Sequence, residues 1–392
     1  LNWDSYLAFH PDERNISWAV TRIHFFDQMN PKFFAYGGLP IYTYRALAEL
    51  VSALTHDTNW IFDWGHIAVI GRYVSATLSS VSILLIYIVA RSFFSQAVGL
   101  TSAFFLAFSP WAIREAHFAT TETSLVFFVL CILWRSLAFL KKPTISGSII
   151  LGTLIGLATA AKTTSVLFLL IPFVSALYSM RTLYRQHKTH RQFFFQTVVF
   201  VTIFVSALTL TFVLLSPYTI LDWQHFTESM SYESGVALGR FPVPYTYQFF
   251  NTIPYLYQVK TMLWQAGLVA IGGLIGITVL MIMVVAEFIP RRISKFISRS
   301  KQSRTKVRYY VLFLIFPIVY FLWQGSWYTK FARYNIPFLP FLTISASWLM
   351  VFLFNKISHK KFYSLICLFV YLIICLFHAW WGFANWTIYT RP

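Results

Sequence analysis

Two adjacent carboxylates, Asp12 and Glu13, are the side chains near the start of the chain best suited to chemistry. They follow His10 and Pro11, and a carboxylate pair held near lipid is costly unless it serves a purpose, which favours a catalytic role. A structural alternative explains the pair equally well, because Asp12 would cap the N-terminus of a helix over residues 14–29. The spacing alone leaves both interpretations open.

Five cations lie outside the interiors of the apolar runs and could bind an anion. They are Arg22, Lys32, Arg114, Lys162 and Arg333. Arginine contacts phosphate through two parallel hydrogen bonds, whereas lysine acts as a point charge. We rank Arg333 and Lys162 first, since both flank apolar runs. An alternative of equal weight is that each of them is an interfacial side chain that only extends its charge to the membrane surface, without binding a ligand.

Polar and aromatic side chains form a second group of candidates for substrate binding. They are His117, Glu122, Tyr42, Tyr218, Asp222 and Tyr334. His117 suits a hydrogen bond to a ligand. The better interpretation is that it is an interfacial histidine whose hydrogen bonds are already made within the protein. Tyr42 suits stacking on a sugar or lining a lipid groove, and its default role is that of an aromatic residue at the membrane interface.

The sequence predicts no metal site. It contains no Asp-x-Asp motif and no His/Cys cluster, and Cys131, Cys367 and Cys375 lie in apolar stretches without metal-ligand spacing. Two adjacent acids can hold Mg²⁺ through a carboxylate, but we predict that no metal is obligatory. The cysteines are expected to be small apolar packing residues.

The elements that must position these residues are membrane helices. With 11% charged residues and a mean hydropathy of +0.62, the chain is far from soluble proteins, in which about a quarter of residues are charged. Apolar runs that approach the length needed to cross a bilayer, about 20 residues, predict an all-α integral membrane protein. The predicted spans cover residues 66–90, 97–110, 121–140, 147–161, 164–180, 194–215, 262–289, 308–323, 335–354 and 362–383.

The distribution of lysine and arginine predicts the orientation of these spans. If the segment before His66 lies outside, the alternate short loops hold more than half of the 31 basic residues, including the run from Arg291 to Arg308. Of the 13 acidic residues only Glu287 falls on that side. The candidate residues then lie on the non-cytoplasmic face, and the basic loops suit contact with anionic membrane lipids. The net charge of +18 is therefore mainly a signal of topology, and nucleic acid is not an expected partner.

Four regions follow from this topology. Residues 1–65 form a first non-cytoplasmic loop that carries the acidic pair and interfacial helices, and residues 216–261 form a second; loops this long tend to carry function. Residues 66–215 and 262–392 hold the spans. Because the chain begins at Leu1 and ends directly after an apolar run, we expect a further helix upstream, making eleven spans, and a soluble domain downstream.

Six short motifs occur in one order along the chain and on one predicted side of the membrane. They are Asp12-Glu13 and residues 34–42 (Phe-Ala-Tyr-Gly-Gly-Leu-Pro-Ile-Tyr), 114–122, 156–162 (Gly-Leu-Ala-Thr-Ala-Ala-Lys), 216–218 (Ser-Pro-Tyr) and 333–337 (Arg-Tyr-Asn-Ile-Pro). In this order they resemble the GT-C superfamily of polyprenyl-phosphate-sugar glycosyltransferases, and within it the branch of protein O-mannosyltransferases and bacterial aminoarabinose transferases (glycosyltransferase family 39). Glu122 departs from the family pattern, in which an aspartate is expected.

The resemblance implies a GT-C-type helical bundle of about 10–11 transmembrane helices and an inverting glycosyltransferase of a bacterial or archaeal plasma membrane. Its donor would be a polyprenyl-phosphate sugar, its acceptor a lipid, a glycan or a protein, and it would need no obligatory cofactor. Asp12 would be the base that deprotonates the acceptor hydroxyl, and Glu13 would orient Asp12 or hold the acceptor. The five cations would stabilise the departing phosphate, and the polar and aromatic group would bind the substrates.

Two other classes of protein remain as alternatives. A transporter should carry ionisable groups near the middle of its spans, and the predicted spans hold almost none, since Arg135 and Glu287 lie near span ends. A non-catalytic lipid-binding subunit could have the same fold. Loss of turnover on mutation of Asp12 would distinguish the enzyme from such a subunit.

Overall fold

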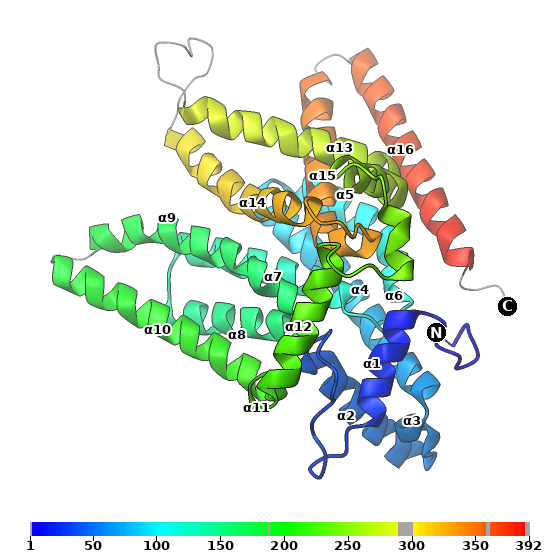
Figure 1. The fold of residues 1–392 in the computed structure, drawn as a ribbon. Coiled ribbons are helices and arrows are strands. Elements are labelled where there is room, and N and C mark those ends of the chain that lie inside the picture. The colour runs from blue at the N-terminus through cyan, green and yellow to red at the C-terminus, as the bar shows by residue number, and fades with distance from the viewer. Residues whose placement is uncertain (1, 187–188, 289–300, 358–360, 389–392) are drawn as a thin grey trace.

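The computed structural model describes residues 2–186, 189–288, 301–357 and 361–388, and that part of the chain is almost entirely helical (Figure 1). Among the described residues, eight helical segments are long and apolar enough to cross a membrane. Helices α5 (Gln96–Ala107) and α6 (Pro110–Ala116), bent by 55°, make a ninth if they count as one span, and α8 (Ile145–Ala161) is a shorter apolar helix. Each predicted apolar run overlaps one of these helices, so the prediction of an all-α polytopic membrane protein is confirmed.

Two of the long spans begin with a turn of 3₁₀ helix, a feature common at the ends of α-helices. The long helices are α4 (Trp64–Phe93), α7 (Glu122–Lys141), α9 (Leu170–Gln186) after η1 (Thr163–Leu169), α10 (His190–Leu215), α13 (Leu256–Phe288), α14 (Lys301–Gly325), α15 (Leu339–Ile357) after η3 (Ala332–Phe338), and α16 (Lys361–Ile388).

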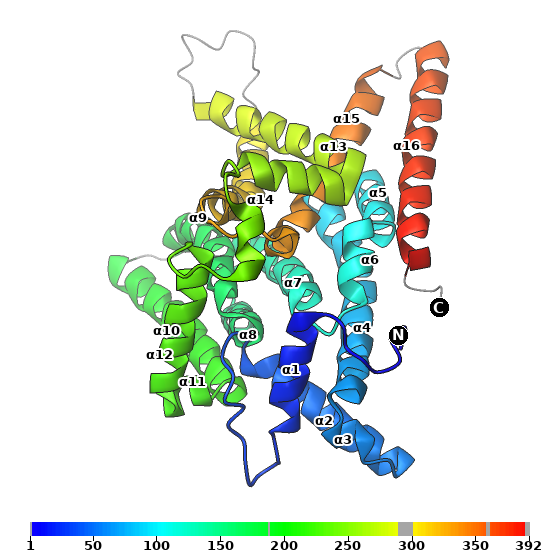
Figure 2. The ribbon, with the colours of Figure 1, turned by 45° about the vertical axis from the view of Figure 1, so that its right-hand side comes forward.

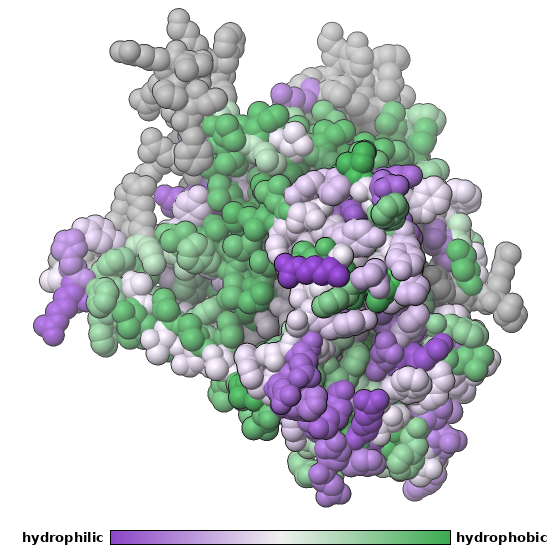
Figure 3. Space-filling view, in the orientation of Figure 1, coloured by the Kyte–Doolittle hydropathy of each residue, from purple (hydrophilic) through white to green (hydrophobic). Residues whose placement is uncertain are grey.

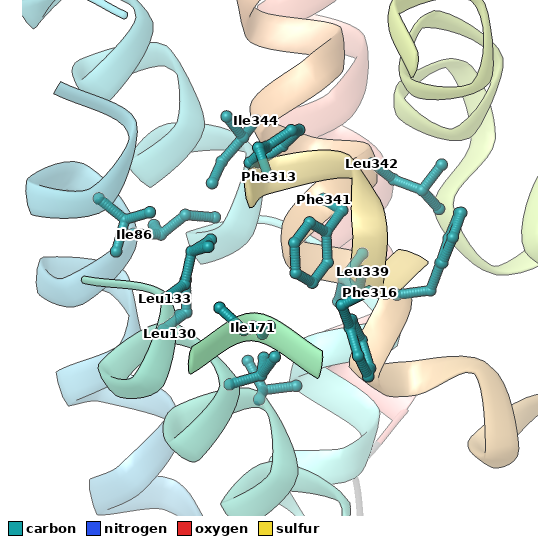
Figure 4. Close-up of a cluster of buried hydrophobic side chains, with 14 of the residues drawn as sticks. Ile86, Leu130, Leu133, Ile171, Phe313, Phe316, Leu339, Phe341, Leu342 and Ile344 are labelled. Atoms are coloured by element: carbon teal, nitrogen blue, oxygen red, sulfur yellow. The ribbon is translucent and has the colours of Figure 1, made fainter. Parts of the chain in front are cut away.

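Helix α7 lies at the centre of the bundle. In its most apolar window 67% of the residues are buried, against 6% in α10. Leu130 and Leu133 of α7 belong to one buried cluster with Ile86 of α4, Ile171 of α9 and Phe313 of α14 (Figure 4). Because lipid tails are as apolar as these side chains, close van der Waals packing rather than the hydrophobic effect stabilises the cluster.

Glycines allow α8 and α10 to approach closely. A Cβ added at Gly152 would lie 2.3 Å from the carbonyl oxygen of Phe204, and one at Gly156 would lie 2.7 Å from that of Leu208. The four-residue spacing places both glycines on the same face of α8, as in other membrane helix pairs with small residues at this spacing. This packing fixes α8, whose C-terminal end is followed by Lys162.

Short helices gather at the end of the bundle opposite to the C-terminal ends of α13 and α15 (Figures 1 and 2). They are α1 (Pro11–Thr21), α2 (Gly38–Thr55) and α3 (Asn59–Phe62) before α4, and α11 (Tyr218–Leu221), α12 (Trp223–Ala237) and η2 (Pro244–Phe249) after α10. Hydrophilic side chains are concentrated at this end, whereas the long helices expose mainly hydrophobic ones (Figure 3). Among the described residues, the short helices therefore form a polar end of an otherwise apolar bundle.

The helix predicted over residues 14–29 is wrong at both ends. Helix α1 spans Pro11–Thr21, and its N-cap is His10, without a side-chain cap hydrogen bond, rather than Asp12. Proline at the first helical position explains the earlier start, because its fixed φ suits that position and its missing N–H costs nothing there. Asp12 and Glu13 consequently lie in the first turn, where the helix dipole favours negative charge.

Part of the predicted orientation depends on residues outside those described. These are Lys188, Arg291, Arg292, Lys295, Arg299 and Lys360. The thiols of Cys131 and Cys375 are free, and the side chain of Cys367 is also outside the described part.

Candidate active site

A cavity of about 690 Å³ lies between α12, the two 3₁₀ helices η1 and η3, and the C-terminal part of α14. Its volume is within the range of about 300–1,000 Å³ that is usual for small-molecule sites. Lys162 and Arg333, the two highest-ranked cations, both line it. Two segments that are remote in sequence therefore bring their positive charges to one site.

Both cations lie where regular helix is interrupted. Lys162 is extended (φ −154°, ψ 127°) between α8 and η1. Arg333 lies in the first turn of η3, after the extended residue Phe331 (φ −60°, ψ 137°). Irregular backbone at membrane depth is tolerated where it lines a cavity rather than lipid, which agrees with the position of both residues.

Arg333 forms an ion pair with Asp12 from the first turn of α1. Its Nη1 lies 2.9 Å from Asp12 Oδ2, and the Asp12 side chain is 15% exposed. The guanidinium also lies over the rings of Phe331 and Tyr334, at 4.7 and 5.7 Å from their centroids. Within the described residues its Nε has no hydrogen-bond partner, so Arg333 keeps donors for a ligand while Asp12 holds it in place.

Lys162 forms the second ion pair, with Glu122 at the start of α7. Lys162 Nζ donates to Glu122 Oε1 at 3.0 Å, and the Glu122 side chain is completely buried. The ammonium group lies 5.3 Å from the ring centroid of Tyr36 and 5.8 Å from that of Tyr334. Both cations therefore contact the ring of Tyr334, and within the described residues Lys162 retains two of its three donors.

Tyr36 lies between the two carboxylates. Burial raises the pKa of its phenol well above the ordinary value, and the negative charges of Asp12 and Glu122 raise it further. The phenol consequently remains neutral at physiological pH and donates a hydrogen bond to Asp12. Tyr36 was not among the candidate residues, although it belongs to the motif at 34–42.

Glu13 lies away from the cavity in a separate buried cluster. Arg72 of α4 donates to it from Nε and Nη2, both at 2.7 Å, and the backbone N–H of Ala119 donates at 2.8 Å. The same guanidinium binds Asp4 through Nη1 at 2.8 Å and Nη2 at 2.6 Å, and all three side chains are completely buried. We name Asp4, Glu13 and Arg72 the buried cluster.

Three other predicted cations do not line the cavity. Arg114 donates to Gln265 of α13 at 2.7 Å and pairs with Glu115. Arg22 is exposed at the C-terminal end of α1, about 15 Å along the helix axis from Asp12. Lys32 lies 3.6 Å from Asp222.

Of the predicted polar and aromatic group, Tyr334 lines the cavity and Glu122 is bonded to a residue that does. The rest lie elsewhere: Tyr42 donates to the Met29 carbonyl at 2.9 Å, the His117 ring contacts the Ile113 carbonyl, and Tyr218 begins α11.

Asp222 belongs to a partly exposed cluster that connects α12 to the loop before α2. It accepts a hydrogen bond from Asn30 at 2.6 Å and contacts His225 at 2.5 Å and Lys32 at 3.6 Å. These hydrogen bonds, from Asn30 first and then His225, lower the pKa of Asp222 to about 2. We name Asn30, Lys32, Asp222 and His225 the surface cluster, and its position predicts a structural role.

The sequence reasoning missed one charged residue of the cavity, Glu233 of α12. Partial burial raises the pKa of its carboxyl group, and repulsion from Asp12 raises it further. The missed signal is a polar stripe on α12, since Thr227, Ser231 and Ser234 follow the three- and four-residue spacing of one helix face. In the described parts of the chain, no group of three His, Cys, Asp or Glu side chains is arranged to hold a metal ion.

Comparison with known proteins identifies relatives of this fold. Residues 58–220 match the model of the family described as dolichyl-phosphate-mannose-protein mannosyltransferase. ArnT from Cupriavidus metallidurans bound to undecaprenyl phosphate is similar in structure, with a TM-score of 0.56 and 15% identity, over 95% of this chain and 61% of that chain. AglB, an oligosaccharyltransferase from Archaeoglobus fulgidus in complex with an inhibitory peptide and a dolichol-phosphate, has a TM-score of 0.57 and 11% identity, over 98% of this chain and 51% of that chain. No curated protein sequence matches the chain.

The helical bundle of this chain is thus shared with ArnT and AglB. The family match over residues 58–220 and the shared fold support the resemblance to the GT-C superfamily that the six motifs indicated. The chain spans 51% to 61% of the length of these solved structures.

Proposed function

We propose that the chain is an inverting glycosyltransferase that moves a sugar from a polyprenyl-phosphate donor to a lipid, glycan or protein acceptor. The observation that carries the proposal is the convergence of Arg333 and Lys162 on one cavity, each held by a carboxylate. Undecaprenyl phosphate bound to ArnT and dolichol-phosphate bound to AglB support a lipid phosphate as the ligand. The distribution of lysine and arginine supports a site on the non-cytoplasmic face, and the two organisms support a bacterial or archaeal plasma membrane.

In the proposed reaction the acceptor oxygen attacks the anomeric carbon from the face opposite to the phosphate. The bond between that carbon and the phosphate oxygen breaks, and its electron pair leaves with the polyprenyl phosphate. Arg333 and Lys162 stabilise the charge that develops on the departing phosphate, and a preorganised arrangement makes such stabilisation effective. The ion pairs with Asp12 and Glu122 supply this preorganisation before the donor binds.

Asp12 accepts the proton of the acceptor hydroxyl in this proposal. A positioned base contributes about 10²–10⁴ in rate. Its carboxylate lies in the first turn of α1, next to Arg333. Tyr36 donates a hydrogen bond to the same carboxylate and so helps to orient it.

The position of Glu13 supports a positioning role rather than contact with the acceptor. Its carboxylate joins α1 to α4 through Arg72 and to the loop before α7 through Ala119. Glu13 thereby orients the first turn of α1, which carries Asp12. The cavity lies at the polar end of the bundle, which favours catalysis at a membrane surface over transport across it.

The proposal is tested with the full-length protein in lipid nanodiscs and a panel of radiolabelled undecaprenyl- and dolichyl-phosphate sugars. The assay follows sugar release for the wild type, Asp12→Asn and the control Asp27→Asn, whose carboxylate is exposed in the loop after α1. Release by the wild type and the control, but not by Asp12→Asn, supports the enzyme and the base. Normal release by Asp12→Asn would remove Asp12 from that role. A wild type that neither releases sugar nor binds any donor would contradict the proposed function.

A further inference from the structure

Helix α12 forms a polar wall of the cavity. The polar wall consists of Thr227, Ser231, Glu233 and Ser234, which all line the cavity. Ser234 is bonded to the Ser231 carbonyl and Thr227 to carbonyls one turn earlier. Within the described part of the chain the Glu233 carboxylate has neither an ion pair nor a hydrogen bond, although it lies close enough to Asp12, Lys162 and Arg333 to interact with their charges. The wall therefore presents a free acceptor to a ligand.

A second part of the cavity lining is an aromatic wall. It consists of Tyr320, Trp323, Trp327 and Tyr334, from the C-terminal part of α14, the segment after it and η3. The rings of Trp323 and Trp327 pack edge to face at 4.5 Å, and those of Trp327 and Tyr334 at 5.8 Å. Each ring thus restrains its neighbour, and the wall is a rigid apolar surface.

A ligand that fits both walls has one apolar face and one edge of hydroxyl groups. Ligand sites generally combine aromatic surface with a few precisely placed polar groups that fix orientation. A pyranose ring has this character, because its C–H groups form an apolar face and its hydroxyls project from the edge. With the donor phosphate at Lys162 and Arg333, the attached sugar would extend into the space between the two walls.

We propose that α12 recognises the transferred sugar, with Glu233 accepting hydrogen bonds from its ring hydroxyls while Trp327 and Tyr334 pack against its apolar face. The inference rests on the proposed function and assigns to Glu233 the choice among sugars. A site built to bond a substrate hydroxyl discriminates strongly, because its polar group is left unpaired when that hydroxyl is missing. Glu233 is thus a specificity residue, whereas Arg333 and Lys162 bind the phosphate common to all donors.

The test compares binding of a sugar-bearing lipid with binding of the same lipid without its sugar. The probes are dolichyl phosphate, dolichyl phosphate mannose and dolichyl phosphate glucose, titrated into the full-length protein in nanodiscs. We expect at least one sugar-bearing lipid to bind the wild type more tightly than dolichyl phosphate. Glu233→Gln should reduce this advantage about 10-fold, the usual scale for one hydrogen bond to a charged group, without weakening the binding of dolichyl phosphate.

Glu228→Gln is the matched control, because Glu228 lies on the same helix, is exposed and bonds to Gln224 instead of lining the cavity. It should behave as the wild type with all three lipids. Equal losses for all three lipids in Glu233→Gln would overturn the inference, since Glu233 would then act on the phosphate or on the fold. No preference of the wild type for either sugar-bearing lipid would also overturn it. Failure to bind even dolichyl phosphate would instead contradict the proposed function.

Discussion

Asp12 and Glu13 are neighbours in sequence, yet they occupy two regions of different character. Successive residues of an α-helix point about 100° apart, so the first turn of α1 directs the Asp12 carboxylate to Arg333, which lines the cavity, and the Glu13 carboxylate into the buried cluster. Asp12 is 15% exposed and pairs with Arg333 beside the cavity. Glu13 is completely buried, and both of its oxygens are bonded to Arg72.

Within this one motif, Glu13 belongs to a cluster that stabilises the fold, whereas Asp12 belongs to the site proposed to carry out the chemistry. In the buried cluster every charge has a fixed partner, and removing one partner would leave another charge buried without compensation. Burial raises the pKa of Asp4, but the hydrogen bond and charge of Arg72 outweigh it, so this pKa is lowered. At the cavity, Arg333 retains a donor that no described residue uses, which is the arrangement expected of a site that awaits a ligand.

The largest expected effect comes from Asp12→Asn. If Asp12 is the base, transfer should fall by about 10²–10⁴, because the amide cannot accept the acceptor proton. The melting temperature should change little, since the side chain is partly exposed and the amide still accepts a hydrogen bond from Arg333. Turnover and thermal unfolding in detergent check this, with Asp27→Asn as the control. If Asp12→Asn instead lost stability as well as turnover, Asp12 would be a structural residue like Glu13, and the two carboxylates would not differ in role.

A substitution in the buried cluster should mainly reduce stability. Arg72→Met leaves the carboxylates of Asp4 and Glu13 buried without a counter-charge, and we expect it to cost about 3–5 kcal/mol of stability. Thermal unfolding measures the loss, and Arg91→Met, an exposed arginine on the same helix, is the control. The triple change Asp4→Asn, Glu13→Gln and Arg72→Met should restore much of the stability. A stable Arg72→Met protein would show that the cluster does not hold α1 in place.

Lys162 tests whether one residue can serve both ligand binding and the stability of the fold. Lys162→Met removes a charged donor from the cavity and should weaken the binding of dolichyl phosphate by about 1.5–3 kcal/mol, or roughly 10- to 100-fold. It also leaves Glu122 buried without its partner, so stability should fall. Adding Glu122→Gln should restore stability but not lipid binding. Lys260→Met, an exposed lysine outside the cavity, should change neither quantity, and recovery of binding in the double variant would show that Lys162 acts only through the fold.

Much of the fold could be predicted from the sequence because membrane spans are a local signal. A run of apolar residues needs no knowledge of its neighbours to be recognised, and each predicted run overlaps a helix. The ranking of Arg333 and Lys162 rested on the same local logic, since both flank such runs. The structure brings them to one cavity, whereas Arg22, Lys32 and Arg114 lie elsewhere.

The partners of the two carboxylates could not be predicted in the same way. Glu13 and Arg72 are 59 residues apart, and their pairing depends on how α1 packs against α4. One signal was available, because a single arginine eight residues into an apolar helix requires a counter-charge. Glu233 was missed because its helix lies in a polar loop, where one more carboxylate is not conspicuous until the cavity next to it is known.

The smallest expected effect concerns the surface cluster, which resembles the buried cluster in its contacts but not in its burial. The pKa of Asp222 is lowered to about 2, so its contacts stabilise the start of α12 above about pH 4, the ordinary range of the group, and are lost as pH falls through 2. Hydrogen exchange of residues 218–237, corrected for the intrinsic rate at each pH, should therefore rise at the start of α12 between pH 4 and pH 2. Asp222→Asn should remove this dependence while His225, Lys32 and Asn30 remain in place. A different outcome would be unfolding of the whole protein over the same pH range in the wild type but not in Asp222→Asn. The ion pairs of Asp222 would then contribute as much to stability as the buried cluster does, contrary to the weak effect expected of surface ion pairs.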